Sequence, residues 1–470
     1  MANANAGAVN QEAPERSILK VAMTALAGSS IEWYDFFIYG TAAALVFPNL
    51  FFPGFGDTAA TILSYSTFAV AFVGRPVGGL IFGHFGDKYG RKRALVTALV
   101  LMGIGTTAIG LLPGYAIIGI AAPILLVALR FLQGVCIGGQ WGGAVLLATE
   151  SAPAEKRGFY GSFAQMGVPV AVLLSNIIFL VIAATLGDDA LVAWAWRIPF
   201  LLSVLLIGLG LYIQLKLEDT PAFRHLQEYR EQHQSEEERR EAEEAAGSPV
   251  WEVLRTYPKE IALAAGAFIA INANFYILIT YILDYATAEV GLPQSTVLTA
   301  VLISSVASLC AIAGFAALSD VIGRRIPYMA GAVLLGLWGL FAFWPLVDSG
   351  SPGALVLALV VGQIFLSMMY GPQAAFYSEI FTTKVRYSGA SMGYQIGSVF
   401  GGALAPIIAT ALLAVTGTSF AVGVYMAVIC AITGVCAFLL AETYGRSMDE
   451  TDEASRERGG TTPGAQEPTT

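Results

Sequence analysis

Long runs of apolar residues recur along this chain, and they constrain its fold more than any other feature. A helix that spans a bilayer needs about 20 mostly apolar residues, and twelve segments of this kind occur here. Their approximate limits are residues 21–47, 61–83, 95–112, 117–145, 159–183, 197–215, 260–283, 293–318, 326–347, 353–376, 389–413 and 418–441. The sequence therefore predicts an all-α membrane protein with twelve transmembrane helices.

Charged residues are scarce, at 13% of 470 residues, which is about half the fraction found in soluble domains. The net charge of −9 comes mostly from acids in the 217–260 loop and in the tails, and we interpret these as solvated surface. We expect no nucleic-acid partner because no basic stripe occurs. The four cysteines lie inside predicted helices, where we expect them to pack as small apolar residues.

Lysine and arginine residues outside the apolar segments fall on one side of the predicted membrane. They lie in the N-terminal tail, after the second, fourth, eighth and tenth segments, in the central loop and in the C-terminal tail. The charged residues of the opposite loops are all acids, namely Asp57, Asp188, Asp189, Asp284, Glu289 and Asp348. Because the basic side is cytoplasmic, we expect both termini in the cytoplasm and the protein in the plasma (inner) membrane.

Two internal repeats divide the chain into halves. An aspartate stands three residues before a glycine and a basic pair at Asp87 and again at Asp320. A glutamate precedes an arginine by seven residues at Glu150–Arg157 and again at Glu379–Arg386. Such repeats are typical of transporters built from two related six-helix units. The predicted regions are a cytoplasmic tail (1–20), a six-helix bundle (21–216), a cytoplasmic linker with an amphipathic helix (217–258), a second bundle (259–442) and a tail expected to be disordered (443–470).

Glycines recur every fourth residue in two of the predicted helices. They form the series Gly134, Gly138 and Gly142, and the series Gly389, Gly393, Gly397 and Gly401. A stripe of this kind allows two helices to approach closely.

The sequence resembles the major facilitator superfamily over nearly its whole length. The loop Gly83–Lys92, with its repeat around Asp320, matches the best-known signature of that superfamily. A narrower resemblance is to its metabolite:proton symporters, which include proline/betaine, shikimate, citrate and 2-oxoglutarate carriers. The matching segments are 32–36, 74–79, 130–134 and 218–223, and 442–445 is similar to sugar porters as well. One difference is Gln140, where this branch usually has a glutamate.

The repeated charged loops predict a conformational latch at the cytoplasmic side. Their acids could pair with arginines, or stabilise the start of a neighbouring helix, only while the two halves are closed there. The alternative is that these charges set topology alone. The residues assigned to the latch are Gly83, Asp87, Arg91, Asp320, Arg324, Glu150, Arg157, Glu379 and Arg386.

Charged residues inside the predicted helices are the candidates for proton coupling, because such residues are costly in a membrane and usually functional. Glu32 and Asp35 are three residues apart and so share one helix face. A carboxylate there could take up a proton and release it when Arg130 moves close. The alternative is a fixed buried ion pair. Which of the two acids carries the proton stays open, with a slight preference for Asp35.

Arg75 is a candidate for binding a substrate carboxylate through its planar fork, although it could instead reach the membrane surface. Polar and aromatic residues of the predicted helices suit an organic solute that is held weakly. For each of them the alternative is helix–helix hydrogen bonding. The further candidates are Trp33, Tyr39, Gln140, Trp141, Gln165, Asn274, Tyr281, Gln363 and Tyr370.

The resemblance implies a secondary active transporter that imports a small polar metabolite, an organic carboxylate or a zwitterion such as a betaine or amino acid, by proton symport. The expected partners are that metabolite, a proton and the lipid bilayer, with the protein as a monomer. No Walker loop is present, so we expect no ATP, and we expect no cofactor or metal. The alternatives are proton-antiport efflux and a sugar or polyol carrier. A membrane enzyme or a solute sensor is disfavoured, because no nucleophile or metal motif and no large extra domain occurs.

Overall fold

The computed structural model describes residues 15–89, 91–138, 145–146, 148–149, 152–216, 255–381 and 386–445. All regular elements in these residues are helices. The predicted linker (217–258) lies outside the described residues up to residue 254, as do the tails up to residue 14 and from residue 446.

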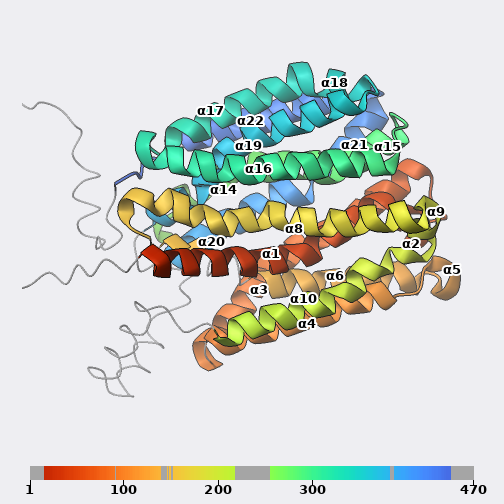
Figure 1. Cartoon of the computed structure of the whole chain (residues 1–470), viewed down its shortest axis with the longest axis horizontal. Helices are drawn as coiled ribbons and strands as arrows, with labels where there is room; N and C mark the ends of the chain where they lie inside the picture. Colours follow the sequence, from red (N-terminus) through yellow and green to blue (C-terminus); the bar gives the residue numbers. More distant parts are fainter. Residues whose placement is uncertain are drawn as a thin grey trace, which may run out of the picture.

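The first half contains long helices joined by short ones (Figure 1). Its elements are α1 (Glu15–Leu45), α2 (Phe47–Phe51), α3 (Asp57–Tyr89), α4 (Arg91–Leu111), α5 (Tyr115–Ile118), α6 (Ala121–Ile137), η1 (Ala154–Lys156), α8 (Arg157–Leu186), α9 (Asp188–Ala190), η2 (Leu191–Ala195) and α10 (Arg197–Lys216). The fourth predicted segment begins at residue 117, but the helix is interrupted at Gly119. This glycine lies between α5 and α6 and adopts a φ of 59°.

The second half repeats this arrangement, with π-helical turns inside three of its passes. Its elements are α14 (Pro258–Tyr276), η3 (Ile277–Tyr281), α15 (Ile282–Ala288), α16 (Gln294–Ile322), α17 (Arg325–Trp338), η4 (Gly339–Phe343), α18 (Trp344–Asp348), α19 (Pro352–Ile380), α20 (Arg386–Ser398), η5 (Val399–Ala403), α21 (Ala405–Thr416) and α22 (Phe420–Leu439). Turns of this type often mark functional regions of a helix.

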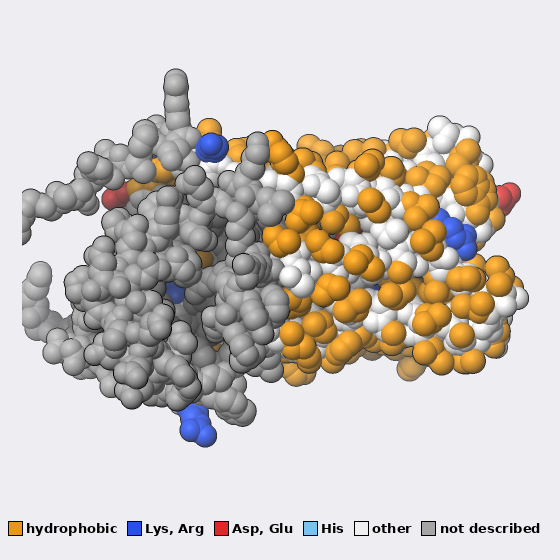
Figure 2. Space-filling view, turned by 90° about the horizontal axis from the view of Figure 1, so that it is seen from below, with side chains coloured by type: hydrophobic (Ala, Val, Ile, Leu, Met, Phe, Trp, Pro, Cys, Tyr) orange, Lys and Arg blue, Asp and Glu red, His pale blue; other side chains and the backbone are white. Residues whose placement is uncertain are grey.

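The described residues form twelve helical passes, as predicted, and their lengths suit a bilayer. Seven of them are long and apolar enough to cross a membrane by length and composition, and the apolar stretches of α4, α6 and α10 are shorter. The remaining two, α1 and α3, have 31 and 33 residues and contain Glu32, Asp35 and Arg75. Hydrophobic side chains cover most of the described surface in Figure 2, with charged ones mostly toward its two ends.

The two halves lie side by side and meet along two seams. On one side, α8 packs against α16 and α19, and on the other, α3 packs against α20, η5 and α21. Figure 1 shows the first seam, with α8 of the first half beside α16 of the second. We call the end of the bundle with Arg157 and Arg324 the basic end. The acidic end is the opposite one, with Asp57, Asp189, Asp284, Glu289 and Asp348.

Glycines bring α3 and α6 into backbone contact. A Cβ added at Gly138 would lie 2.0 Å from the carbonyl oxygen of Arg75, and one at Gly134 would lie 2.1 Å from that of Ala71. In the second half, a Cβ at Gly401 would lie 2.6 Å from the carbonyl oxygen of Ile269. The predicted close approach is confirmed at these glycines, whereas Gly142 lies outside the described residues. The contact places Arg75 of α3 and Arg130 of α6 deep in the same half.

Candidate functional site

The centre of the first half holds two acids and two arginines. Glu32 and Asp35 lie on α1, Arg75 on α3 and Arg130 on α6, and all four are buried. Burial of four ionisable groups inside a membrane bundle is costly, so such groups usually pair with one another or serve the transport pathway.

Asp35 and Arg130 are joined through two neutral side chains. The Arg130 Nη1 donates to Gln133 Oε1 at 3.0 Å, and the Gln133 Nε2 donates to Thr106 Oγ1 at 2.6 Å. Thr106 Oγ1 in turn donates to Asp35 Oδ2 at 2.8 Å. The arginine and the carboxylate therefore communicate along a hydrogen-bonded chain. Among the described ion pairs, none joins them directly.

The Arg130 guanidinium packs against aromatic rings, and some of its nitrogens make no hydrogen bond. Its Cζ lies 4.3 Å from the ring centre of Phe36 and 4.1 Å from that of Tyr39. These distances allow cation–π attraction. Its Nε and Nη2 have no hydrogen-bond partner, and neither does the second oxygen of Asp35. The hydroxyl of Tyr39 donates to Thr67 Oγ1 at 2.6 Å, which fixes the ring under the guanidinium.

Arg75 lies among aromatic residues in a similar way. Its Cζ lies 5.1 Å from the ring centre of Trp33 and 4.5 Å from that of Phe72, and it hydrogen-bonds to the side chain of Tyr276 from the second half. Its Nε and Nη2 are unpartnered, as is one oxygen of Glu32. The Arg75 side chain is 1% exposed, so it is enclosed by protein.

A small cavity lies between the halves beside these residues. Its volume is about 20 Å³, enough for about one water molecule, so the halves are closed around the centre in this structure. The lining residues are Trp33, Val168, Phe268, Ile271, Asn272, Phe275, Tyr276, Leu366, Tyr370 and Tyr394. Of the predicted substrate residues, Trp33 and Tyr370 line this cavity, and Arg75 adjoins it.

The other predicted substrate residues lie elsewhere. Gln165 donates to Gln373 Oε1 at 2.8 Å across the two halves. Asn274 faces α22, where its Nδ2 lies 3.4 Å from the Cys430 sulfur. Tyr281 and Gln363 are buried without a partner for their polar side-chain atoms. Gln140 and Trp141 lie outside the described residues.

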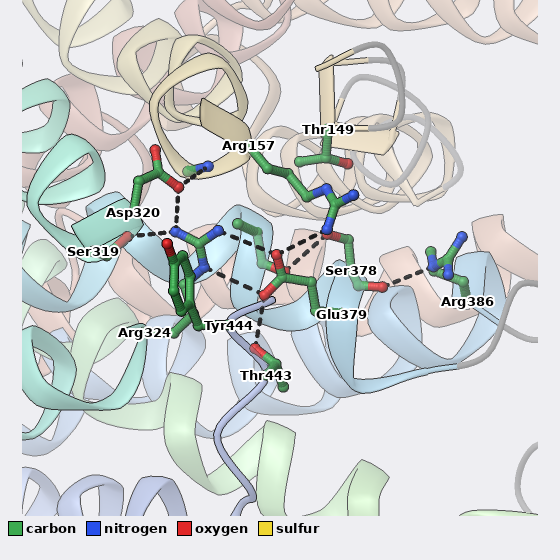
Figure 3. Close-up of polar contacts among 12 residues, drawn as sticks. Thr149, Arg157, Ser319, Asp320, Arg324, Ser378, Glu379, Arg386, Thr443 and Tyr444 are labelled. Atoms are coloured by element: carbon green, nitrogen blue, oxygen red, sulfur yellow. Dashed lines mark hydrogen bonds and ion pairs between the residues drawn. The ribbon is translucent and has the colours of Figure 1, made fainter. Parts of the chain in front are cut away.

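The basic end holds a charged network that joins the halves (Figure 3). Arg157 of α8 forms an ion pair with Glu379 of α19 at 3.3 Å. Arg324 donates to both oxygens of Glu379, at 3.2 and 3.3 Å, and to Asp320 Oδ1 at 2.6 Å. The two oxygens of Asp320 also accept from the backbone N–H groups of Gly158 and Phe159, at 2.8 Å each. An acid of the second half therefore caps the start of a helix in the first.

Four of the residues predicted for the latch meet in this network, namely Asp320, Arg324, Arg157 and Glu379. Arg386 instead donates to the carbonyl oxygen of Ser378 within its own half, at 2.8 Å. Glu150 lies outside the described residues. At Gly83, Asp87 and Arg91 the structure describes only the backbone.

Glu442, for which the sequence predicted no role, completes the network. Its carboxylate accepts from the backbone N–H groups of Arg324 and Arg325, at 3.0 Å each, and so caps α17. Partial burial opposes ionisation of Glu442, but these donors, with those of Thr443 and Tyr444, hold the pKa of its carboxyl below the usual range. The segment 442–445 was recognisable as a motif in the sequence, but its contact with the backbone of Arg324 and Arg325 was not.

Thr106, Gln133 and Gln373 are further polar residues of the site that sequence reasoning missed. Gln133 lies one helical turn after Arg130, a spacing that could have marked it as a partner. Thr106 and Gln373 had no signal, because a lone threonine or glutamine in an apolar helix is common.

Comparison with known proteins agrees with this architecture. The profile of the family described as "Sugar (and other) transporter" matches residues 20–454. The inner membrane metabolite transport protein YhjE of Escherichia coli (strain K12) is 40% identical over 93% of this chain and 97% of its own length. The shikimate transporter of the same organism is 38% identical over 90% of this chain and 94% of its own.

A solved structure shows the same fold. The proton:xylose symporter XylE, of the major facilitator superfamily, aligns with a TM-score of 0.70 at 18% identity, over 93% of this chain and 98% of that one. The two bundles are joined across a closed central site, the family profile covers nearly the whole length and the relatives are transporters, so the chain belongs to the sugar (and other) transporter family and is a transporter, not an enzyme.

Proposed function

We propose that this protein imports a small polar organic solute, a carboxylate or a zwitterion, together with a proton by alternating access. The observation that carries the proposal is the chain Asp35–Thr106–Gln133–Arg130. It lies in the half whose α1 also contributes Trp33 to the lining of the cavity between the halves. A carboxyl group with one unpartnered oxygen can accept a proton there. An arginine fork with two unpartnered nitrogens can respond by changing its hydrogen bonds.

The proposal extends to the way the protein lies in the membrane. The relative YhjE is described as an inner membrane protein, and we infer the same membrane here. The basic end is then cytoplasmic, with both termini and the 217–258 linker on that side, because positive residues mark the cytoplasmic face. We infer a monomer, since each bundle packs on the other within one chain.

The charged network supports an alternating-access cycle. Its contacts between Arg157 and Glu379, and between Asp320 and the start of α8, form only when the halves meet at the basic end. They stabilise closure at the cytoplasmic side, so opening there must break them.

A sugar or polyol is the second candidate substrate, and the family description favours it. The chain's own central arginines favour an acid, because neutral hydroxyls do not need two buried guanidinium groups.

Transport by purified protein in proteoliposomes tests the proposal. Counterflow of labelled organic acids, zwitterions and sugars, first at equal pH and then with an inward proton gradient, separates substrate class from coupling. We expect exchange of a carboxylate-bearing solute and its accumulation under the gradient. Exchange of sugars alone, or accumulation that ignores the gradient, would contradict the proposal.

A further inference from the structure

We propose that Asp284 is a second proton-binding acid of this protein, in addition to Asp35, and that its protonation closes the acidic end of the bundle. Asp284 lies on α15, near Tyr281 of η3 and Tyr65 of α3. None of these three residues belongs to the hydrogen-bonded chain between Asp35 and Arg130. The inference goes beyond the proposed function, because it concerns the acidic end and needs no substrate.

The two halves meet between the central cavity and the acidic end. There α1 of the first half packs against η3 and α15 of the second. A Cβ added at Gly40 of α1 would lie 3.4 Å from Thr280 Oγ1 of η3, and Thr280 is 2% exposed. Solvent can therefore reach Thr280 from the acidic end only after the halves have separated there.

Asp284 follows this contact by one helical turn and has no cation to pair with. Its side chain is partly buried, and the charged residue that acts on it is another acid, Glu289. The described ion pairs all lie at the basic end, and Arg197 of the acidic end packs against Trp196 instead. Loss of water from a carboxylate without a counter-charge disfavours its ionised form. Closure of the acidic end therefore favours a protonated Asp284, and by linkage its protonation favours closure.

Two buried tyrosine hydroxyls near Asp284 have no hydrogen-bond partner. Tyr281 lies in the same half as Asp284 and Tyr65 in the other, and they are 1% and 0% exposed. Both interact electrostatically with Asp284, and Tyr65 also interacts with Tyr281. A protonated carboxyl group has a donor as well as an acceptor, so one hydroxyl can accept from it while the other donates to it. A neutral Asp284 can thus join the halves without leaving a charge in the seam.

Asp348, another acid near Tyr281, is arranged differently. Its Oδ1 accepts from the Tyr285 hydroxyl at 2.6 Å, and its Oδ2 accepts from the Ser419 hydroxyl at 2.5 Å. Tyr285 lies on α15, Asp348 ends α18 and Ser419 precedes α22, so these bonds hold α15 within its own half. Asp284, on the same short helix, interacts instead with Tyr65 of the other half. A change in its protonation therefore acts between the halves.

Thiol labelling of Thr280→Cys, in a background without the native cysteines, measures opening of the acidic end. Each rate is divided by that of Ser351→Cys, an exposed position at the same end, so that the pH dependence of the thiol chemistry cancels. In purified protein in lipid nanodiscs without substrate, we expect a normalised rate at least fivefold lower at about pH 5.5 than at about pH 8. Equal rates at the two pH values would overturn the inference.

Asp284→Asn identifies the group that titrates, because the amide resembles the protonated acid. Its rate at the alkaline pH should fall to within twofold of the unsubstituted rate at the acidic pH. A high rate at both pH values would mean that Asp284 only packs the seam, and an unchanged pH response would mean that another group titrates. Either result would overturn the inference.

Three further measurements complete the test. Asp57→Asn removes an exposed acid at the same end and should keep the fivefold response, so its loss there would attribute the effect to the general negative field. Tyr65→Phe should weaken the response at least twofold, and it decides the question if Asp284→Asn does not fold, because a full response would then overturn the inference. Replacement of choline chloride by sodium chloride at the alkaline pH should change the rate less than twofold. A fall as large as that at the acidic pH would assign the site to sodium and not to a proton.

Discussion

Arg324 and Arg130 are both 0% exposed, yet their surroundings differ. The Arg324 guanidinium donates through all three nitrogens, to Glu379, Asp320 and Ser319. Arg130 donates through one, to Gln133, and its other two nitrogens lie against aromatic rings without a hydrogen-bond partner. The fully paired arginine stabilises one arrangement of the halves. The incompletely paired one keeps donors available for a ligand or for a change of protonation.

The basic end and the centre of the first half would also respond differently to separation of the two halves. Separation of the halves at the basic end would expose Arg324, Glu379 and Arg157 to water, which can replace their hydrogen bonds. The charges at the centre are surrounded mostly by aromatic rings, such as Phe36 and Tyr39, and several of their polar atoms have no hydrogen-bond partner. The network at the basic end can therefore form and break in each cycle, while the central groups need a partner that enters the cavity.

Asp35→Asn should have the largest effect and tests the central region directly. The amide cannot take up and release a proton, so accumulation under a pH gradient should be abolished while exchange at equal pH continues. Glu32→Gln should impair accumulation less. Uptake of labelled substrate into proteoliposomes with and without a gradient measures both. Wild-type accumulation by both variants would remove α1 from the coupling mechanism.

Arg130→Lys should lower the transport rate tenfold or more. Each factor of ten corresponds to about 1.4 kcal/mol of free energy. Lysine keeps the charge but lacks the planar fork. Arg197→Lys, at the acidic end and only partly buried, is the control and should transport within about twofold of wild type. Normal transport by Arg130→Lys, together with misfolding of Arg130→Ala, would show that Arg130 is structural.

Glu379→Gln should loosen the basic end without harming the centre. The loss of charge weakens its hydrogen bonds to Arg324 and Arg157, and hydrogen bonds to charged groups contribute about 1.5–3 kcal/mol each. We expect about tenfold faster thiol labelling of Ala375→Cys, a buried position on α19, in a background without the native cysteines. Labelling of Ser351→Cys, at the other end of α19, should not change. Equal labelling of Ala375→Cys with and without Glu379→Gln would show that the charges of this network set the membrane topology and do not control closure.

Gln165→Leu should have the smallest effect, because the hydrogen bonds it removes, to Gln373 Oε1 and at 3.4 Å to the carbonyl oxygen of Tyr370, are uncharged. Gln165 and Gln395 occupy related positions in the two halves, and each crosses to the other half, to Gln373 Oε1 at 2.8 Å and to the carbonyl oxygen of Gly138 at 3.3 Å. Loss of one neutral hydrogen bond costs about 1 kcal/mol. Ala375→Cys labelling should therefore rise only a few-fold, and Gln395→Leu should match it. A response as large as that of Glu379→Gln would show that these amides, not the charges, control closure.

The identity of the charged residues in the central site could be predicted from the sequence, but their hydrogen-bond partners could not. Glu32, Asp35, Arg75 and Arg130 stand out because a charge within an apolar helix is rare. A fixed ion pair with Arg130 was the alternative to proton coupling, but Thr106 and Gln133 lie between Asp35 and Arg130. Neither had a signal strong enough to assign, because single polar residues are frequent in helices of this kind.

The number of passes, the two related halves, the side on which the basic residues gather and the identity of the buried charges could all be predicted from the amino-acid sequence. Those features depend on the hydropathy and spacing of neighbouring residues, which are local properties. The contacts by which Asp320 caps α8, Glu442 caps α17 and Gln165 meets Gln373 became known from the fold alone. Each of these contacts joins helices far apart in the chain, and the way the helices pack, as where Gly134 and Gly138 let α3 and α6 touch, sets which side chains meet.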